Sequence, residues 1–381
     1  MSKTIIRCDI AIAGGGLSAG LIALALTARH PQMDVRLIER EARLGGNHIW
    51  SFFDSDIAPE DRWIVEPLIC HRWQGYDVLF PKLSRTLKET YNSIESERLN
   101  SVLRKKIPAD RLMLGEVVDL THQMVRLADG REIHPQRVID ARGAGELSHL
   151  SCGWQKFLGQ KLHVPGGHGL SRPIVKDATV AQIDGYRFVY CLPFDAETVF
   201  VEDTYYADTP EIDAPALRQR IGDYTTARGW AETKVLHEET GCLPVIMGGD
   251  FRSYWDSTGQ DIVKSGLRAG LCQPVTGYSL PDAVRLASMI AANPALPDAA
   301  LIRHAAAQWR ARSYYRMLDK MLFRAADPDC RYQVLERFYA LSEGLISRFY
   351  AGQSTWWDKA RLLIGKPPVP IGRAIKAILE K

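Results

Sequence analysis

The chain has 381 residues, which is long enough for two domains or one large two-part domain. A hydrophobic content of 46% and a charged content of 24% are those of a soluble globular protein, and a net charge of only +3 gives no reason to expect a nucleic-acid partner. The seven cysteines are scattered without a Cys-x-x-Cys pair, which disfavours a disulfide framework and a metal site and fits a cytoplasmic protein.

The first fifty residues predict a strand, a glycine-rich turn, a helix and a second strand. The first strand covers Cys8 to Ala13 and leads into Gly14-Gly15-Gly16-Leu17-Ser18-Ala19-Gly20. The second strand, Val35 to Ile38, ends in Glu39. The uncharged stretch from Ile10 to Ala28 resembles a signal peptide or a membrane span, but the strand, turn and helix account for the same residues.

This arrangement is typical of a dinucleotide site. Gly14 allows a tight turn, and Gly16 lets the backbone approach a pyrophosphate. Ala19 or Gly20 lets the helix pack close to the strand, and the helix N-terminus offers N–H groups and a positive dipole end to phosphate oxygens. Glu39 is placed to bind ribose hydroxyls.

Two further motifs point to a flavin as the cofactor. Arg43-Leu44-Gly45-Gly46 follows Glu39 and Arg40 and resembles the Arg-x-Gly-Gly extension of flavoproteins. Much later, Gly266 to Gly270 precedes Pro274-Val275-Thr276-Gly277-Tyr278, which resembles a C-terminal flavin motif. A nicotinamide site or a simple glycine turn explains the first motif and leaves the other two without a role.

The remaining segments predict two interleaved domains. Arg137 to Gly143 predicts a strand that stops at Asp140 and returns to the same parallel sheet, whereas residues 40 to 93 are predicted to be loop-rich. Tyr186 to Leu192 and Val199 to Tyr206 predict an antiparallel hairpin. We expect an α/β fold with a Rossmann-like FAD-binding domain (1–150 and 260–300), an antiparallel substrate-side sheet (151–259) and a helical region that is a candidate for facing a membrane (301–381).

Adjacent acids lie on the second strand of the hairpin. Side chains alternate along a strand, so Glu202 shares a face with Phe200 and Tyr206, whereas Asp203 lies on the opposite face. A carboxyl group among apolar neighbours has a raised pKa and remains a proton donor near neutral pH. Two solvated acids near a turn explain the same residues, and His237 to Pro244, which carries Glu238 and Glu239, is interpreted as a surface turn.

The C-terminal segment is basic and carries two adjacent tryptophans. Residues 351–381 have a formal charge of +4, with Trp356 and Trp357 beside several aliphatic side chains. Basic residues with tryptophan suit an anionic lipid surface. Amphipathic helices packed on the core give the same pattern.

Taken together, these motifs resemble bacterial-type lycopene β-cyclases, a branch of the flavoproteins that includes aromatic hydroxylases. The resemblance spans nearly the whole chain and includes Gly45 to Phe52, Gly185 to Tyr190, Val201 to Thr204, Gly266 to Leu280 and Gly365 to Pro370. One departure is Cys272-Gln273-Pro274-Val275, where the family pattern has His-Pro-Thr; the flavin contact expected there is made mostly by backbone.

The resemblance implies site residues and a cofactor. Glu202 and Asp203 become the candidate catalytic residues, and Tyr190, Phe188, Tyr205 and Tyr206 are candidates to stabilise a cation. The expected cofactor is FAD, active in its reduced form, with NAD(P)H as the reductant. The residues expected to bind it are Gly14, Gly15, Gly16, Ala19, Gly20, Glu39, Arg40, Gly45, Gly46, Asp140, Gly143, Gly270, Pro274, Thr276, Gly277 and Tyr278.

The resemblance also implies a reaction without net redox change. An acid protonates one end of lycopene or a related acyclic carotenoid, the cation is attacked by a neighbouring double bond, and loss of a proton leaves a β-ionone ring. Either Glu202 or the flavin delivers the proton. Expected partners are the cytoplasmic face of the membrane, where the protein would be peripheral, and other carotenoid-pathway enzymes. A redox flavoenzyme, either a monooxygenase or an isoprenoid reductase, and a non-catalytic flavin- or lipid-carrying protein remain alternatives.

Overall fold

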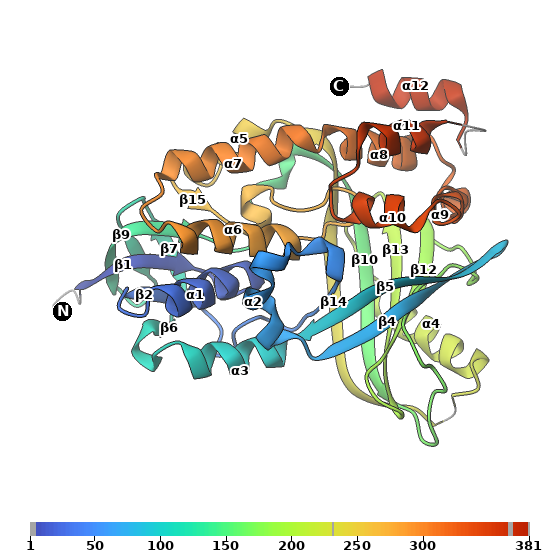
Figure 1. Ribbon diagram of the computed structural model, residues 1–381, viewed down its shortest axis with the longest axis horizontal. Helices are drawn as coiled ribbons and strands as arrows, with labels where there is room; N and C mark the ends of the chain where they lie inside the picture. Colours follow the sequence, from blue (N-terminus) through green and yellow to red (C-terminus); the bar gives the residue numbers. More distant parts are fainter. Residues whose placement is uncertain (1–4, 231, 365–368, 380–381) are drawn as a thin grey trace.

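Two β-sheets, placed side by side, organise the molecule (Figure 1). The computed structural model describes residues 5–230, 232–364 and 369–379. The predicted fold class is confirmed: a Rossmann-like parallel sheet, an antiparallel sheet and a helical C-terminal region are all present. The two sheets lie in the left and right halves of Figure 1, and the C-terminal helices cover the upper right.

The first sheet is built around parallel strands with the order β6-β2-β1-β9-β8-β7, and β15 also pairs with β9. Its strands are β1 (Ile5–Ala13), β2 (Val35–Glu39), β6 (Leu112–Leu114), β7 (Val117–Leu120), β8 (Val125–Leu127), β9 (Glu132–Asp140) and β15 (Val263–Lys264). β1 lies parallel to both β2 and β9, as predicted for the strand that ends at Asp140. Helix α1 (Leu17–Arg29) packs against this sheet with a mostly buried surface.

The second sheet has eight strands in the order β14-β10-β13-β12-β11-β4-β5-β3. Their bounds are β3 (Ile49–Phe53), β4 (His71–Phe80), β5 (Leu83–Glu95), β10 (Leu150–His163), β11 (Ile174–Asp177), β12 (Tyr186–Pro193), β13 (Thr198–Ala207) and β14 (Lys234–Gly249). The predicted hairpin is confirmed as β12 and β13. All pairings are antiparallel except the parallel pair β11–β4.

The stretch from residue 40 to 93, predicted to be loop-rich, contains β3, β4 and most of β5. A β-bulge at Gly75, whose φ is +92°, explains why β4 was not predicted. Trp73 precedes the bulge, and Tyr76, Val78 and Phe80 follow it, so the inward side chains lose their period of two at Gly75. These strands join the second sheet, which therefore draws residues from both sides of the domain boundary predicted at residue 150.

The helices cover both faces of the second sheet. α4 (Ala214–Ala227) contributes to a core on one face that includes Val199 and Val201. α8, α9 and α10 contribute to the aromatic core on the other face, with Phe200 and Tyr206. The other helices are α2 (Arg62–Val65), α3 (Ser96–Lys106), α5 (Phe251–Asp256), α6 (Leu280–Ala292) and α7 (Asp298–Ala311), followed by α8 (Ser313–Arg324), α9 (Tyr332–Tyr339), α10 (Glu343–Tyr350), α11 (Trp356–Leu363) and α12 (Ile371–Leu379).

The C-terminal helices α11 and α12 leave large apolar side chains exposed. Trp356 and Trp357 stack with a centroid distance of 3.5 Å, and 63% and 67% of their surfaces are exposed. Ile371, Ile375, Ile378 and Leu379 on α12 are also exposed. Within the described residues, no helix combines the length and the apolarity that crossing a membrane requires. Gly365, Lys366, Pro367, Pro368, Glu380 and Lys381, which contribute to the predicted basic segment or to the resemblance, lie outside the described residues.

Candidate active site

A cavity of about 1090 Å³ is lined by residues of both sheets and of the C-terminal helices. Its wall on the side of the first sheet includes the glycine loop Gly14–Gly16 and the segment Thr276–Ser279. Its wall on the side of the second sheet includes Glu202, and Tyr350 of α10 also lines it. The volume slightly exceeds the usual range for small-molecule sites, about 300–1,000 Å³, so the cavity has room for more than a small metabolite.

The glycine loop connects β1 to α1 and faces open space. Gly14 has a φ of +101°, and a Cβ there would lie 2.8 Å from the Ala141 carbonyl oxygen, so only glycine fits. A Cβ at Gly16 would meet no atom within 4 Å. Gly16 caps α1 without a side-chain hydrogen bond, and α1 has no acid in its first turn, so the first N–H groups of the helix remain available to an anion.

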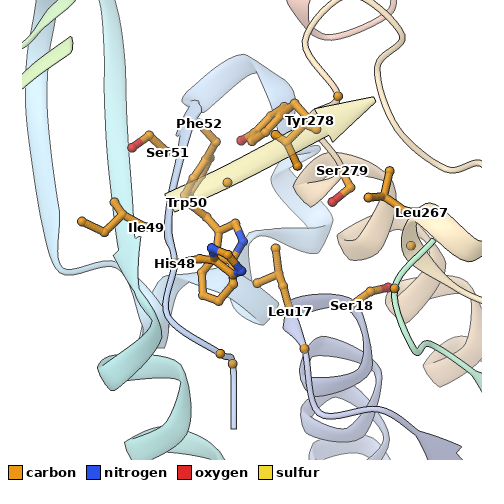
Figure 2. A pocket seen from close by; sticks show the side chains of 18 of the residues that line it. Leu17, Ser18, His48, Ile49, Trp50, Ser51, Phe52, Leu267, Tyr278 and Ser279 are labelled. Atoms are coloured by element: carbon orange, nitrogen blue, oxygen red, sulfur yellow. The ribbon is translucent and has the colours of Figure 1, made fainter. Parts of the chain in front are cut away.

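Side chains from distant parts of the chain meet at this end of the cavity (Figure 2). Leu17 and Ser18 lie at the start of α1, with Leu267 and Ser279 nearby, and His48, Trp50 and Tyr278 also line this region. Glu39 is the last residue of β2, and its Oε2 accepts a hydrogen bond from the Gly15 backbone N–H at 2.5 Å. Glu39 thereby stabilises the glycine loop, whose neighbouring N–H groups face the cavity.

The structure separates the predicted cofactor residues into two sets. Those that line the cavity are Gly14, Gly15, Gly16, Glu39, Arg40, Gly45, Gly46, Gly143, Thr276, Gly277 and Tyr278. Ala19, Gly20, Asp140, Gly270 and Pro274 lie outside its lining.

Two residues of the second set have clear positions behind the wall. Asp140 is fully buried and accepts hydrogen bonds from Arg142, which does line the cavity, while Arg268 lies 3.4 Å away. A Cβ added to Gly20 would come within 3.1 Å of Leu103, so Gly20 allows α1 to approach α3.

Glu202 extends from β13 into the cavity. The Thr204 hydroxyl donates a hydrogen bond to Glu202 Oε1 at 2.6 Å. Burial raises the pKa of Glu202 to about 8, and the charge of Glu239 adds to this rise. The carboxyl group is therefore a protonated acid at neutral pH, facing a cavity with the aromatic residues Tyr190 and Phe200 in its wall.

Asp203 lies on the opposite face of β13, as the alternation along the strand predicts. Its side chain is fully buried and lies outside the lining of the cavity. It forms an ion pair with the buried Arg187, with Nη2 and Oδ2 2.5 Å apart. Asp203 is thus placed to hold β12 and β13 together.

A row of polar side chains crosses the second sheet beneath the cavity. On β12, Tyr190 is the cross-strand partner of Glu202. On the other side of Glu202, Gly159 of β10 is its partner, and Glu239 of β14 pairs in turn with Gly159. Lys176 of β11 lies beyond Tyr190, and its Nζ is 3.7 Å from the centre of the Phe188 ring. Burial lowers the pKa of Lys176 to about 7, although the charge of Glu202 opposes this shift.

Sequence reasoning missed two titratable groups and misplaced a third. Lys176 and Asp56 line the cavity, and burial raises the pKa of Asp56 to about 7. The interpretation of His237 to Pro244 as a surface turn is wrong, because the segment belongs to β14 and Glu239 is buried. Glu239 accepts a hydrogen bond from the Ile49 N–H at 3.0 Å and lies 3.7 Å from His48.

Of the aromatic residues proposed to stabilise a cation, Tyr190 lines the cavity, whereas Phe188, Tyr205 and Tyr206 do not. Tyr205 belongs to the core on the far face of the sheet, because it is an odd number of residues from Glu202 on the same strand. Tyr91, Phe157, Phe200, Tyr339 and Tyr350 line the cavity instead.

Solved structures with this fold belong to flavin-dependent enzymes and a related reductase-like protein. A flavin-dependent brominase matches with a TM-score of 0.61 at 13% identity, over 94% of this chain and 97% of that one. p-Nitrophenol 4-monooxygenase from Pseudomonas putida matches with a TM-score of 0.60 at 14% identity, over 92% and 99%. A geranylgeranyl bacteriochlorophyll reductase-like protein from Thermoplasma acidophilum matches with 0.57 at 14%, over 98% of both chains. The likeness to these three structures shows that the chain has their fold.

Sequence comparison narrows this class to one family. The family model described as lycopene cyclase protein matches residues 9–376. Lycopene beta-cyclase of Pseudescherichia vulneris is 45% identical over 98% of this chain and 97% of its own length, and that of Pantoea ananas is 42% identical over 97% and 98%. The chain belongs to the lycopene cyclase family.

Proposed function

We propose that this protein is a lycopene β-cyclase, which converts lycopene through γ-carotene to β-carotene by closing its linear ends into β-ionone rings. The observation that carries the proposal is Glu202, a protonated acid facing a cavity with aromatic walls. The near full-length similarity to lycopene beta-cyclases supports the choice of substrate.

The residues of the cavity suit an acid-initiated isomerisation. Glu202 donates its proton to C2 of the terminal double bond, which leaves a tertiary cation at C1. The C5=C6 double bond attacks this cation and closes the six-membered ring, and loss of a proton from C6 leaves the ring double bond. Tyr190 and Phe200 offer aromatic faces to the positive charge and exclude water from it.

FAD fits the other end of the cavity. The open space at Gly16 and the uncapped N-terminus of α1 suit a pyrophosphate, and Glu39 suits a ribose. Thr276, Gly277 and Tyr278 would lie along the flavin. In its reduced, anionic form FAD supplies negative charge that favours a cation in the cavity. We propose NAD(P)H as its reductant.

The stoichiometry of the reaction tests this function. With purified protein, lycopene in vesicles, reduced FAD and NAD(P)H under anaerobic conditions, we expect β-carotene to form without stoichiometric oxidation of NAD(P)H, because substrate and product are isomers. Chromatography gives the amount of product, and absorbance at 340 nm gives the NAD(P)H oxidised. If one NAD(P)H is oxidised per product molecule, the protein is a redox flavoenzyme instead, and the isomerase proposal fails.

We further propose that α11 and α12 bind the cytoplasmic face of a membrane, where other carotenoid-pathway enzymes would deliver the substrate. Lycopene has no polar group and resides in lipid. Trp356, Trp357 and the aliphatic side chains of α12 are exposed, and Arg361, Arg373 and Lys376 lie among them. Exposed apolar side chains next to basic residues are typical of helices that lie in a lipid interface.

Vesicle flotation tests the membrane surface. We expect tighter binding to anionic than to neutral vesicles and weaker binding as salt rises, since each cation near an anionic surface contributes about 1 kcal/mol. Replacing both Trp356 and Trp357 by Ala should weaken binding to both kinds of vesicle. The matched control replaces Leu114 and Val118, which are 57% and 50% exposed on the first sheet, by Ser. Equal flotation with anionic and neutral vesicles would contradict the proposed electrostatic contribution to membrane binding.

A further inference from the structure

Lys176 is a buried lysine without a direct ion-pair partner among the described residues. Only 4% of its surface is exposed, and it lines the cavity. Among the described residues, its Nζ forms no hydrogen bond and no ion pair. A buried lysine in this position is unusual, because buried charged groups are normally paired.

The surroundings of Lys176 place its amine in the same cavity as the candidate proton donor, with strand β12 between them. Phe188, Tyr190 and Tyr186 on β12 surround Nζ, with ring centres at 3.7, 5.6 and 5.9 Å. On β13, Glu202 is the carboxyl group whose charge acts on Lys176. Tyr91 of β5, Tyr339 of α9 and Tyr350 of α10 line the same cavity, and their hydroxyls are neutral at physiological pH.

We propose that Lys176 is a positioning residue of the cyclisation, which acts through its charge on Glu202 and on the cation formed beside it. The inference rests on the proposed function. When the amine is neutral, Glu202 keeps the proton that it donates to C2. When Lys176 is protonated, its positive charge favours ionised Glu202 and opposes the carbocation in the same cavity, and cyclisation stops.

The two groups titrate as a coupled pair, and one protonation state is active. With one proton held on Glu202 and none on Lys176, the acid is ready and the lysine adds no positive charge to the cavity. A second proton charges Lys176, and removal of the first leaves Glu202 without a proton to donate. The rate of the wild-type protein should therefore fall on both sides of an optimum near neutral pH. Burial lowers the pKa of the Lys176 amine and raises the pKa of the Glu202 carboxyl group, so that the pair titrates in the neutral range.

Three variants measured over a pH series test this role. Lys176→Met removes the titrating amine and keeps the length of the side chain, so we expect the fall in rate on the acidic side to disappear. Lys176→Arg keeps a positive charge at every pH, so we expect a loss of cyclisation of at least tenfold throughout. The control is Lys156→Met, a buried lysine on the same sheet that lies over the Tyr205 ring and outside the cavity, and it should leave the pH profile unchanged.

Each result supports or overturns the inference. FAD content and thermal melting, measured on each variant, show whether the site and the fold are intact. If Lys176→Arg proves to be destabilised, the result for Lys176→Met decides. If Lys176→Met keeps the acidic fall of the wild type, or a folded Lys176→Arg cyclises at the wild-type rate, Lys176 has no such role. Failure of the wild type to cyclise lycopene at any pH would instead refute the proposed function.

Discussion

Replacing Glu202 by Gln should abolish cyclised product while leaving the flavin site intact. Gln has the shape of Glu and its amide oxygen accepts the hydrogen bond from Thr204, but it has no acidic proton to donate. General acid catalysis typically contributes about 10²–10⁴-fold, and protonation of an unactivated alkene belongs at the high end. Product analysis in a lycopene-accumulating host, together with the flavin absorbance of the purified variant, measures both effects.

The pH dependence gives an independent check on Glu202. Its pKa is raised to about 8, so the neutral acid predominates below pH 8 and is lost as the pH rises above it. Wild-type cyclisation should therefore decline on the alkaline side. A Glu202→Gln variant that keeps near wild-type rates would refute the role of Glu202, and Glu239 or the flavin would then be the next candidate proton donor.

Replacing Asp203 by Asn should cost stability, in contrast to the change at Glu202. Asn removes the charge that pairs with Arg187, whose guanidinium is buried with only 5% of the residue exposed. Breaking a buried ion pair by removing one partner typically costs about 3–5 kcal/mol, because the remaining charge is left uncompensated. Denaturant unfolding of the two variants side by side measures the difference.

A double variant separates the lost charge from other effects of the substitution. Asp203→Leu combined with Arg187→Met replaces both charges by apolar groups and should recover most of the lost stability. Glu202→Gln is the matched control on the same strand and should unfold within about 1 kcal/mol of the wild type, because Glu202 forms no ion pair with any residue that the structure describes. An Asp203→Asn variant as stable as this control would show that Arg187 tolerates the loss of its partner.

The elements that could be predicted from the sequence depend on local patterns. The turn after β1 needs glycine at Gly14 because of a positive φ, and that need is visible in the residue type. The opposite faces of Glu202 and Asp203 follow from the period of a strand, which holds without any knowledge of the partner strands.

The groups that could not be predicted owe their positions to long-range pairing. Lys176 comes close to Glu202 only because β11, β12 and β13 are neighbours in the sheet. Glu239 reaches the same row through the register of β10 with β14, and Gly159 separates the two acids. Neither relation has a counterpart in the local sequence, and the bulge at Gly75 also hid the strand that connects the two halves of this sheet.

The composition of the cavity has a consequence for how the protein is made. Its wall combines Gly14 from the start of the chain, Glu202 from the middle and Tyr350 from near the end. The parallel pair β4–β11 joins segments nearly one hundred residues apart, and such distant pairings slow folding. During synthesis the binding cavity therefore cannot close until α10 has left the ribosome. Before that point the aromatic face of the second sheet is uncovered, and exposed apolar surface of this kind makes an incomplete chain prone to aggregation.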